Sequence, residues 1–289
     1  MRRWLISAVV FLGSVFAGFG QAATPSGVDG SRQEPHCLIY LLAGQSNMDG
    51  RGNVKDLTGP LAKYAQPLPA VSICFAAGGL HRPYRENQGL EPLQPGCSGT
   101  PAKAGGKPPA NTFGPELGFG HAMAEALPGR KILLIKVSEG GTNLSSDWNP
   151  DATGKLYAQF IKFVQATQQK ITEAGGTSEI RGLLWMQGES DAGSSTEQYQ
   201  TRLAGLIART RADLKIKELP FLIGQVYDNG KRNTVIAAQK AVAKAIPATA
   251  FVEADGLQTF DKGTHFDAAS QIELGKRFAR EMLRLNPQK

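Results

Sequence analysis

The sequence predicts an α/β protein, a three-layer α/β/α sandwich with a central parallel sheet of about five strands. Short apolar runs alternate with longer amphipathic segments five times along the chain. Each run is apolar throughout, which is typical of strands covered on both faces in a parallel sheet. No internal repeat or linker interrupts the alternation, so we expect one domain over residues 37–289.

The first strand is expected from Cys37 to Ala43, where an apolar run that follows Pro35 ends at Gly44. The same kind of run predicts strands over residues 71–76, 131–137, 182–186, 220–226 and a short sixth at 251–254. Between the second and third strands, residues 78–112 are rich in Gly and Pro and show little periodicity. Because long loops inside compact domains are usually functional or disordered, we interpret this stretch as a wall or lid of a substrate site.

Helical periodicity is clearest in residues 156–171, where Leu156, Phe160, Phe163 and Val164 fall on one side. Gly175 and Gly176 end that helix. The other helices are expected over residues 113–127, 199–214, 231–246 and 267–285.

The N-terminus is typical of a secretory signal peptide over residues 1–22. Arg2 and Arg3 precede an apolar stretch, and small residues precede a cleavage site after Ala22. Residues 23–36 are interpreted as a flexible leader. No later stretch is apolar enough to cross a membrane, so we expect a secreted or periplasmic protein.

The charge of the chain argues against nucleic acid as a partner. The formal net charge is +7, and removal of Arg2 and Arg3 with the signal peptide leaves +5 (7 − 2). These positive charges are scattered, without the Lys/Arg cluster that a nucleic-acid surface needs. The sequence also predicts no metal site, because the four histidines and three cysteines fit no zinc-ligand spacing.

Cys37, Cys74 and Cys97 can oxidise in an exported protein. We expect a Cys74–Cys97 disulfide, because these two residues bracket the Gly/Pro-rich loop. A Cys37–Cys74 pair on adjacent strands is the alternative. One thiol is left over in either case.

Three predicted strands are followed by clusters of small or polar residues: Ser46, Gly140–Gly141 and residues 187–191. The carboxyl ends of parallel strands share one edge of a sheet, and α/β proteins keep their sites there. A fourth polar cluster, residues 261–267, precedes the last helix. Taken alone, Ser46 could simply cap a helix. The coincidence of four clusters favours a functional role.

These clusters contain the groups of a serine hydrolase. Ser46 can act as nucleophile, His265 as the base that takes its proton, and Asp261 as the carboxylate that orients the imidazole. The backbone N–H groups of Ser46 and Gly140 and the side-chain amide of Gln187 can stabilise the oxyanion.

At this point a family resemblance is evident. It rests on four motifs: Gly44–Gln45–Ser46–Asn47–Met48, Trp185–Met186–Gln187–Gly188–Glu189–Ser190, His265–Phe266–Asp267 and Leu274–Gly275. With these motifs the chain resembles the SGNH hydrolase superfamily, whose fold is flavodoxin-like. Within it, the chain is similar to the acetylesterases grouped with sialate O-acetylesterases and acetylxylan esterases, carbohydrate esterase family 6. The resemblance covers about residues 37–285.

The resemblance implies Ser46 as nucleophile, His265 as base and Gly140 as second oxyanion donor, with Gly141 as the alternative. It implies that Gln187 stands where many relatives have an asparagine. One position departs from the family, whose acid lies three residues before the histidine. Lys262 occupies that position here, and Asp261 lies four residues before. Other acids that could replace it are Asp267 and Asp255.

The sequence therefore predicts a secreted serine esterase that removes O-acetyl groups from carbohydrate, of the acetylxylan or sialate type, without a cofactor. Asn47, Glu189 and Trp148 are candidate substrate contacts. Two alternatives remain: a lipid-directed SGNH esterase with an apolar acyl channel, and a non-catalytic glycan-binding protein on an esterase scaffold.

Overall fold

The structure is a computed structural model that describes residues 37–87, 89–99, 112–151, 154–261 and 263–286. The chain divides into Met1–Glu34 and Pro35–Lys289, and every described residue belongs to the second unit. The predicted signal peptide and leader therefore lie outside the described residues. In the part of the chain that is described, no helix is long and apolar enough to cross a membrane.

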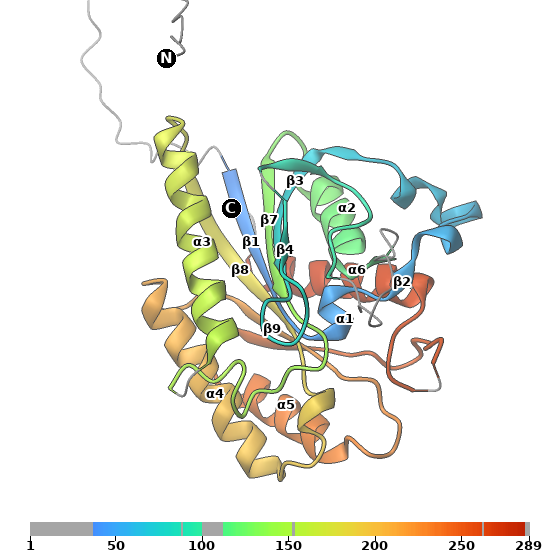
Figure 1. Cartoon of the computed structure of the whole chain (residues 1–289), viewed down its shortest axis with the longest axis vertical. Coiled ribbons are helices and arrows are strands. Elements are labelled where there is room, and N and C mark those ends of the chain that lie inside the picture. The colour runs from blue at the N-terminus through green and yellow to red at the C-terminus, as the bar shows by residue number, and fades with distance from the viewer. Residues whose placement is uncertain (1–36, 88, 100–111, 152–153, 262, 287–289) are drawn as a thin grey trace, which may run out of the picture. The chain divides into compact units, whose positions relative to one another are not determined.

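The strands and helices follow the predicted alternation (Figure 1). The strands of the main sheet are β1 Cys37–Gly44, β3 Leu68–Ala77, β4 Arg85–Glu86, β5 Glu91–Leu93, β7 Lys131–Ser138, β8 Ser178–Met186, β9 Phe221–Gly224 and β10 Thr249–Val252. The helices are α1 Ser46–Asp49, α2 Glu116–Ala126, α3 Lys155–Glu173, α4 Thr196–Asp213, α5 Asn233–Ala245 and α6 Ala268–Leu285. Short 3-10 turns lie at Val54–Asp56, Gly59–Ala65 and Glu189–Asp191.

The described strands of the main sheet run in the order β10-β9-β8-β1-β7-β3-β4, and β5 also pairs with β3. All pairs from β10 to β3 are parallel, whereas β4 and β5 are antiparallel to β3. The predicted parallel sheet is thus confirmed. The prediction missed β4, β5 and a small second sheet, β2 Gly52–Asn53 with β6 Thr112–Phe113. These strands are too short to show a periodicity in sequence.

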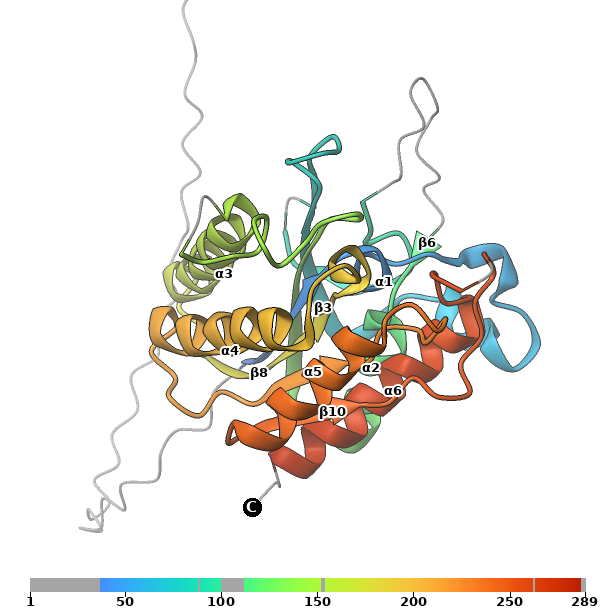
Figure 2. The same cartoon turned by 90° about the horizontal axis from the view of Figure 1, so that it is seen from below.

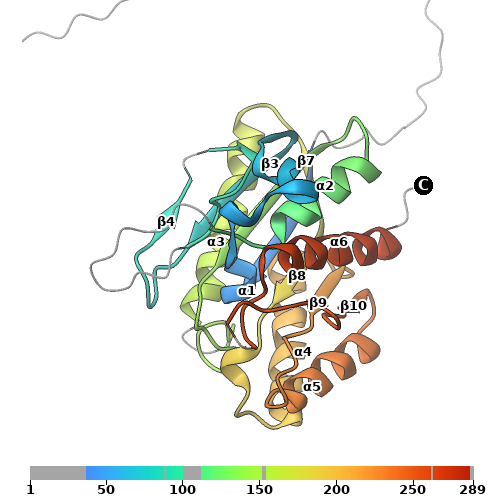
Figure 3. The same ribbon diagram turned by 90° about the vertical axis from the view of Figure 1, so that its right-hand side faces the viewer.

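Helices cover both faces of the sheet, which makes the three predicted layers (Figures 2 and 3). On one face Tyr40 of β1 packs edge-on against Phe119 of α2, with ring centroids 5.3 Å apart, and α6 packs beside α2. On the other face Ala43 of β1 and Trp185 of β8 share a buried cluster with Phe160 of α3 and Leu206 of α4. Successive side chains of β1 therefore point to opposite faces of the sheet and pack into two apolar layers.

The predicted disulfide is wrong, because all three cysteines are free thiols. Cys74 Sγ points toward Thr167 of α3, 3.9 Å away. Cys97 Sγ lies 3.5 Å from the carbonyl oxygen of Gln94. The alternative Cys37–Cys74 pair is also ruled out by topology, because β7 lies between β1 and β3. Burial raises the pKa of Cys97 to about 12.

A buried ion pair lies beneath α1. Lys136, in the middle of the sheet, is fully buried, and its Nζ donates to Glu116 Oε2 at 2.8 Å and to the carbonyl oxygen of Asp49 at 2.9 Å. Glu116 Oε1 accepts the backbone N–H of Gly114 at 2.8 Å. Lys136 therefore joins β7, the start of α2 and the last residue of α1.

Substitution of Lys136 by Met should lower the free energy of unfolding by about 3–5 kcal/mol, because it leaves the carboxylate of Glu116 buried and unpaired. The double variant Lys136→Met/Glu116→Gln should recover part of this loss, because it removes the unpaired charge. Urea denaturation of the three proteins measures both effects. A single variant as stable as wild type would contradict this account of the pair.

Candidate active site

The register of three strands brings the predicted clusters together. Gly44 at the end of β1 pairs with Ser138 of β7 on one side and with Met186 of β8 on the other. The three strands therefore end at the same level, and the residues that follow them emerge side by side. These are Ser46, Gly140 and Gln187.

Ser46 is the first residue of the short helix α1. The N-cap of that helix is Gln45, and no side chain caps it, so the interpretation of Ser46 as a simple helix cap is wrong. Gln45 N–H donates to the carbonyl oxygen of Met186 at 3.0 Å, which ties the turn before Ser46 to the end of β8.

His265 lies between Ser46 and Asp261. Its Nε2 is 3.0 Å from Ser46 Oγ, and its Nδ1 is 2.5 Å from Asp261 Oδ2. Asp261 Oδ1 accepts the backbone N–H groups of Thr264 and His265 at 3.1 and 2.8 Å. Burial by itself raises the pKa of Asp261, but these hydrogen bonds and the imidazole outweigh it and hold the pKa below the ordinary 3.8. The carboxylate is thus ionised at neutral pH and available to orient the imidazole.

The two other acids that the sequence offered have different partners. Asp267 is the N-cap of α6, and its side chain accepts the backbone N–H of Ser270 at 2.8 Å. Asp255 Oδ1 accepts Gln225 Nε2 at 2.8 Å. Of the three carboxylates considered, Asp261 is the one that contacts His265.

Gly140, and not Gly141, faces Ser46. A Cβ built on Gly140 would lie 3.4 Å from Ser46 Cβ and only 2.5 Å from Arg51 Nη2. A Cβ on Gly141 would meet no atom within 4 Å among the described residues. A side chain at 140 would therefore displace the guanidinium of Arg51.

Gln187 is buried in a polar network beneath the site. Its amide nitrogen lies 2.6 Å from Asp191 Oδ2 and 3.1 Å from both the carbonyl oxygen of Thr142 and Gln45 Oε1. Three acceptors thus compete for two hydrogens. The role of this amide as an oxyanion donor stays a prediction, because it requires one of these bonds to be exchanged.

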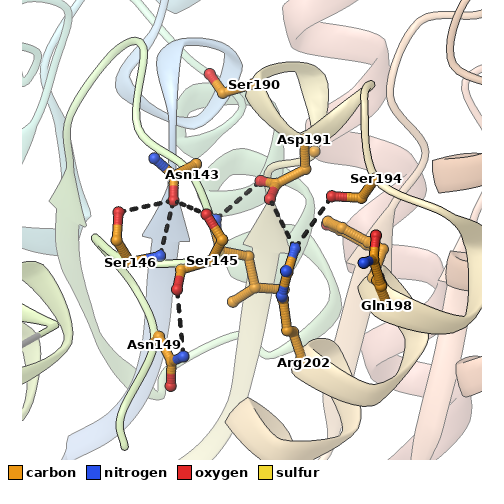
Figure 4. Close-up of polar contacts among 12 residues, drawn as sticks. Asn143, Ser145, Ser146, Asn149, Ser190, Asp191, Ser194, Gln198 and Arg202 are labelled. Carbon is orange, nitrogen blue, oxygen red and sulfur yellow. Dashed lines mark hydrogen bonds and ion pairs between the residues drawn. The ribbon is translucent and has the colours of Figure 1, made fainter. Parts of the chain in front are cut away.

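Asp191 is the anchor of that network. Its Oδ2 accepts the backbone N–H of Leu144 at 2.8 Å, and its Oδ1 lies 3.9 Å from Arg202 Nη1 (Figure 4). Burial raises the pKa of Asp191, although the bonds from Leu144 and Gln187 oppose this effect. Asp191 therefore connects the loop after β7 with the turn after β8 and with α4.

Two of the predicted substrate contacts are not accessible to a substrate. Trp148 is fully buried, donates from Nε1 to Thr142 Oγ1 at 3.0 Å and packs edge-on against Trp185, so it cannot stack on a sugar. Asn47 is also fully buried. Sequence position alone could not distinguish a buried polar residue at a strand end from an exposed one.

Asn47 instead holds the backbone on both sides of the imidazole. Its Nδ2 donates to the carbonyl oxygen of Thr264 at 2.9 Å, and its Oδ1 accepts the N–H of Phe266 at 3.1 Å. The same Nδ2 donates to Glu189 Oε1 at 2.6 Å. The residue next to Ser46 thus fixes the loop that carries His265.

The carboxyl group of Glu189, the third predicted substrate contact, is buried, and among the described residues its Oε2 has no hydrogen-bond partner. Burial raises the pKa of Glu189, and the bond from Asn47 and the charge of Arg232 only partly offset this effect. Arg232 also supports the His265 loop, because it donates to the carbonyl oxygen of Gly263 and to Thr264 Oγ1.

The sequence reasoning missed three residues that lie near Ser46 or His265. Arg51 and Arg82 both approach Gly140. Phe260 lies nearly parallel to the His265 ring, with centroids 6.0 Å apart, and is 59% exposed. None of the three directly follows a strand of the parallel sheet. A search for residues at the carboxyl ends of predicted strands therefore could not find them. Across the described residues, no group of His, Cys, Asp and Glu could hold a metal ion.

With this geometry established, the comparisons with known proteins identify the family. Residues 36–284 match the model of a family described as "carbohydrate esterase, sialic acid-specific acetylesterase". The chain belongs to this carbohydrate esterase family. The enzyme is thus a carboxylic ester hydrolase, as the sequence predicted.

Individual relatives agree with this assignment. A probable carbohydrate esterase of Arabidopsis thaliana is 28% identical over 258 residues, which cover 86% of this chain and 91% of the relative. The X-ray structure of that Arabidopsis protein superimposes with a TM-score of 0.64 at 25% identity, covering 86% of this chain and 98% of that one.

Two more distant structures share the fold alone. A carbohydrate acetylesterase from Xanthomonas citri has a TM-score of 0.60 at 22% identity, over 86% of this chain and 56% of that one. A GDSL-like protein from Parabacteroides merdae has a TM-score of 0.52 at 12% identity, over 88% and 97%. The esterase therefore has the SGNH/GDSL hydrolase fold.

Replacement of Glu189 by Gln should stabilise the esterase at neutral pH. The folded-state pKa of Glu189 lies above its ordinary value of 4.5, so the folded chain binds this proton more tightly than the unfolded chain does. The wild type should therefore lose stability relative to the variant as pH rises from about 4.5. Urea unfolding of both proteins between about pH 4 and pH 8 measures the gap. A gap that does not widen with pH would contradict the raised pKa.

Proposed function

We propose that the protein is a secreted carbohydrate O-acetylesterase that works through Ser46, His265 and Asp261. The observation that carries the proposal is the continuous chain of contacts from Ser46 Oγ through both imidazole nitrogens to the Asp261 carboxylate. Secretion is proposed on the sequence of residues 1–22 alone.

In the first half of the reaction, His265 Nε2 takes the proton of Ser46 Oγ, and the oxygen attacks the acetyl carbonyl carbon. The imidazolium that forms then gives its proton to the sugar oxygen as the bond between that oxygen and the acetyl carbon breaks, which releases the sugar hydroxyl and leaves the acetyl group on Ser46. Asp261 keeps Nδ1 protonated and stabilises the positive charge of the ring. In the second half, water attacks the acetyl-enzyme by the same route and releases acetate.

The oxyanion is assigned to the backbone N–H groups of Ser46 and Gly140, with the amide of Gln187 as third donor. For this, Gln187 would exchange its bond to Gln45 for one to the oxyanion. The exchange is inexpensive because Gln45 Oε1 also lies within reach of the N–H groups of Gly188 and Ser190, at 3.2 and 3.4 Å. Such a donor is typically worth about 10²- to 10³-fold in kcat.

The proposal gives Phe260 the contact with the sugar that Trp148 cannot make. Its ring is exposed and adjoins the imidazole, so a pyranose carrying the acetyl group can lie against it.

Ser46→Ala should abolish hydrolysis of 4-nitrophenyl acetate and of acetylated sugars while leaving the fold intact, because Oγ is the attacking atom. Loss of a triad nucleophile costs about 10⁶-fold in kcat. Steady-state rates with purified protein measure the loss, and circular dichroism serves as the fold control. A variant that retains more than about a hundredth of the wild-type rate would rule out the nucleophile assignment.

The acid is tested by Asp261→Asn beside Asp267→Asn and Asp255→Asn. The first should lower kcat by about 10³- to 10⁴-fold with little change in KM, because the neutral amide no longer fixes the tautomer or stabilises the imidazolium. Asp267→Asn should cost about 1 kcal/mol of stability or less, because asparagine also caps helices well. If Asp261→Asn retained near-normal kcat while another of the three lost it, the acid would be assigned to that residue.

A further inference from the structure

A buried guanidinium lies beside the proposed oxyanion site. Measured from the position of a Cβ built on Gly140, Arg51 Nη2 is 2.5 Å away and Ser46 Cβ is 3.4 Å away. Nη2 is therefore at most 5.9 Å from Ser46 Cβ, the sum of the two distances. A Cβ lies about 2.5 Å from the backbone nitrogen of its own residue, so Nη2 is also within about 5 Å of the nitrogen of Gly140.

This spacing allows Arg51 and Gly140 to bond the same oxygen. Two N–H donors can share one acceptor when their nitrogens are no more than about 6 Å apart, which is twice the usual N–O distance of about 2.9 Å. The backbone N–H of Gly140 is already assigned to the oxyanion. Arg51 Nη2 lies within this limit and can therefore reach that oxygen as well.

The other nitrogen of the guanidinium group is held firmly. Arg51 Nη1 lies 2.5 Å from Asp49 Oδ2 and donates to the carbonyl oxygen of Gly50 at 2.8 Å. Asp49 Oδ1 in turn accepts the N–H of Gly99 at 2.6 Å and the hydroxyl of Ser138 at 3.0 Å. The carboxylate offsets the cost of burying the cation, and these bonds fix the orientation of the guanidinium plane.

Nη2 itself is left without a partner. The side chain of Arg51 is 8% exposed, yet its hydrogen bonds to the described residues all involve Nη1. A buried donor without an acceptor is costly, and an arginine with a purely structural role would be expected to pair it. The unpaired nitrogen instead lies beside Gly140 and Ser46, where a substrate oxygen can accept its hydrogen bond.

The amide of Gln187 is less available than Arg51 Nη2. Its nitrogen already has three acceptors within reach, so it must give up a bond before it can serve the oxyanion. Arg51 needs no such exchange. A donor that is fixed and unpaired before the reaction costs no reorganisation when the negative charge develops.

We propose that Arg51 Nη2 donates a hydrogen bond to the acetyl carbonyl oxygen and is a further catalytic residue of the esterase. This inference rests on the proposed function and adds a donor to its oxyanion site. As Ser46 Oγ bonds to the carbonyl carbon, an electron pair of the C=O bond moves to the oxygen, and Nη2 shares the resulting charge with the two backbone N–H groups. When the C=O bond re-forms and the sugar oxygen leaves with the proton from His265, Arg51 has given up no proton.

Arg51→Lys tests this donor, because lysine keeps a positive charge opposite Asp49 but has one nitrogen in place of two. The kcat for 4-nitrophenyl acetate should fall by about 10²- to 10³-fold with little change in KM, the usual loss for one oxyanion donor. The fall for an O-acetylated methyl xyloside should agree within about threefold, because both esters form the same oxyanion whatever the leaving group is.

Methylboronic acid provides a readout that does not depend on turnover. Its boron adds to Ser46 Oγ, and the adduct has a methyl group and a negatively charged tetrahedral centre like those of the acetyl intermediate. Because such analogues are bound by the contacts of the transition state, the inhibition constant should rise in Arg51→Lys by about the factor that is lost in kcat.

Asp49→Asn is the matched control, because it perturbs the same buried pair without removing Nη2. Its kcat should fall by less than about tenfold, well short of the loss of an oxyanion donor. Circular dichroism and urea unfolding check the fold of both variants. If Arg51→Lys does not fold, the double variant Asp49→Asn/Arg51→Gln removes both charges together and is expected to show the same losses of rate and of boronate binding.

A folded Arg51→Lys enzyme that keeps kcat and boronate inhibition within about threefold of wild type would overturn the role of Arg51. A loss confined to the acetylated sugar, or an equal loss in Asp49→Asn, would overturn it too, and the esterase proposal would stand in each case. Wild type that hydrolyses neither ester, with Ser46→Ala indistinguishable from it, would instead overturn the proposed function.

Discussion

The close approach of two strands at Gly44 is the constraint on which the site depends. A Cβ at this position would lie 2.1 Å from the carbonyl oxygen of Met186, and φ is +150°, so only glycine fits. Gln45 N–H donates to the carbonyl oxygen of Met186 at the end of β8, and Glu139 N–H, which follows β7, donates to the carbonyl oxygen of Gly44. Three strand ends are thereby tied to one another before any catalytic side chain is placed.

Two buried ion pairs lie beneath or beside α1. Lys136 of β7 and Glu116 of α2 are fully buried and form an ion pair, and Asp49 and Arg51 form a second buried pair. Apolar packing would cost less in desolvation, but it has no preferred direction. Hydrogen bonds from Lys136 and Ser138 to Asp49 specify where α1 ends, and this end fixes the height of Ser46 above the sheet.

The parallel sheet and its helices could be predicted because the strands are short apolar runs and the helices repeat apolar residues at helical spacing. The same logic located Ser46, Gly140 and Gln187, since the carboxyl ends of parallel strands share one edge of the sheet. The sequence could not show that Trp148 is too buried to contact a substrate. Its burial depends on packing against Trp185, which lies 37 residues away in sequence. The sequence also could not indicate Arg82, because nothing local shows that a loop is held to the site by the distant carboxylate of Glu139. The prediction of a Cys74–Cys97 disulfide was wrong because a loop between two cysteines in sequence does not show where their side chains point. Cys74 on β3 faces Thr167 of α3, whereas Cys97 lies in a loop and contacts the carbonyl oxygen of Gln94.

Ser46 and His265, the proposed nucleophile and base, come from distant parts of the chain, and Asn47 connects them. It follows Ser46 directly, and its side chain bonds the residues on either side of His265. Any shift of α1 therefore carries the His265 loop with it, so the 3.0 Å contact between Oγ and Nε2 is preserved. Proton transfer depends steeply on such distances, and an error of about 1 Å can cost 10²-fold in rate. Because Asn47 is fully buried, water does not compete for these hydrogen bonds. Breaking one of them would leave a buried polar group without a partner, which is costly. A polar side chain beside Ser46 thus supports the proposed chemistry best when no substrate can reach it.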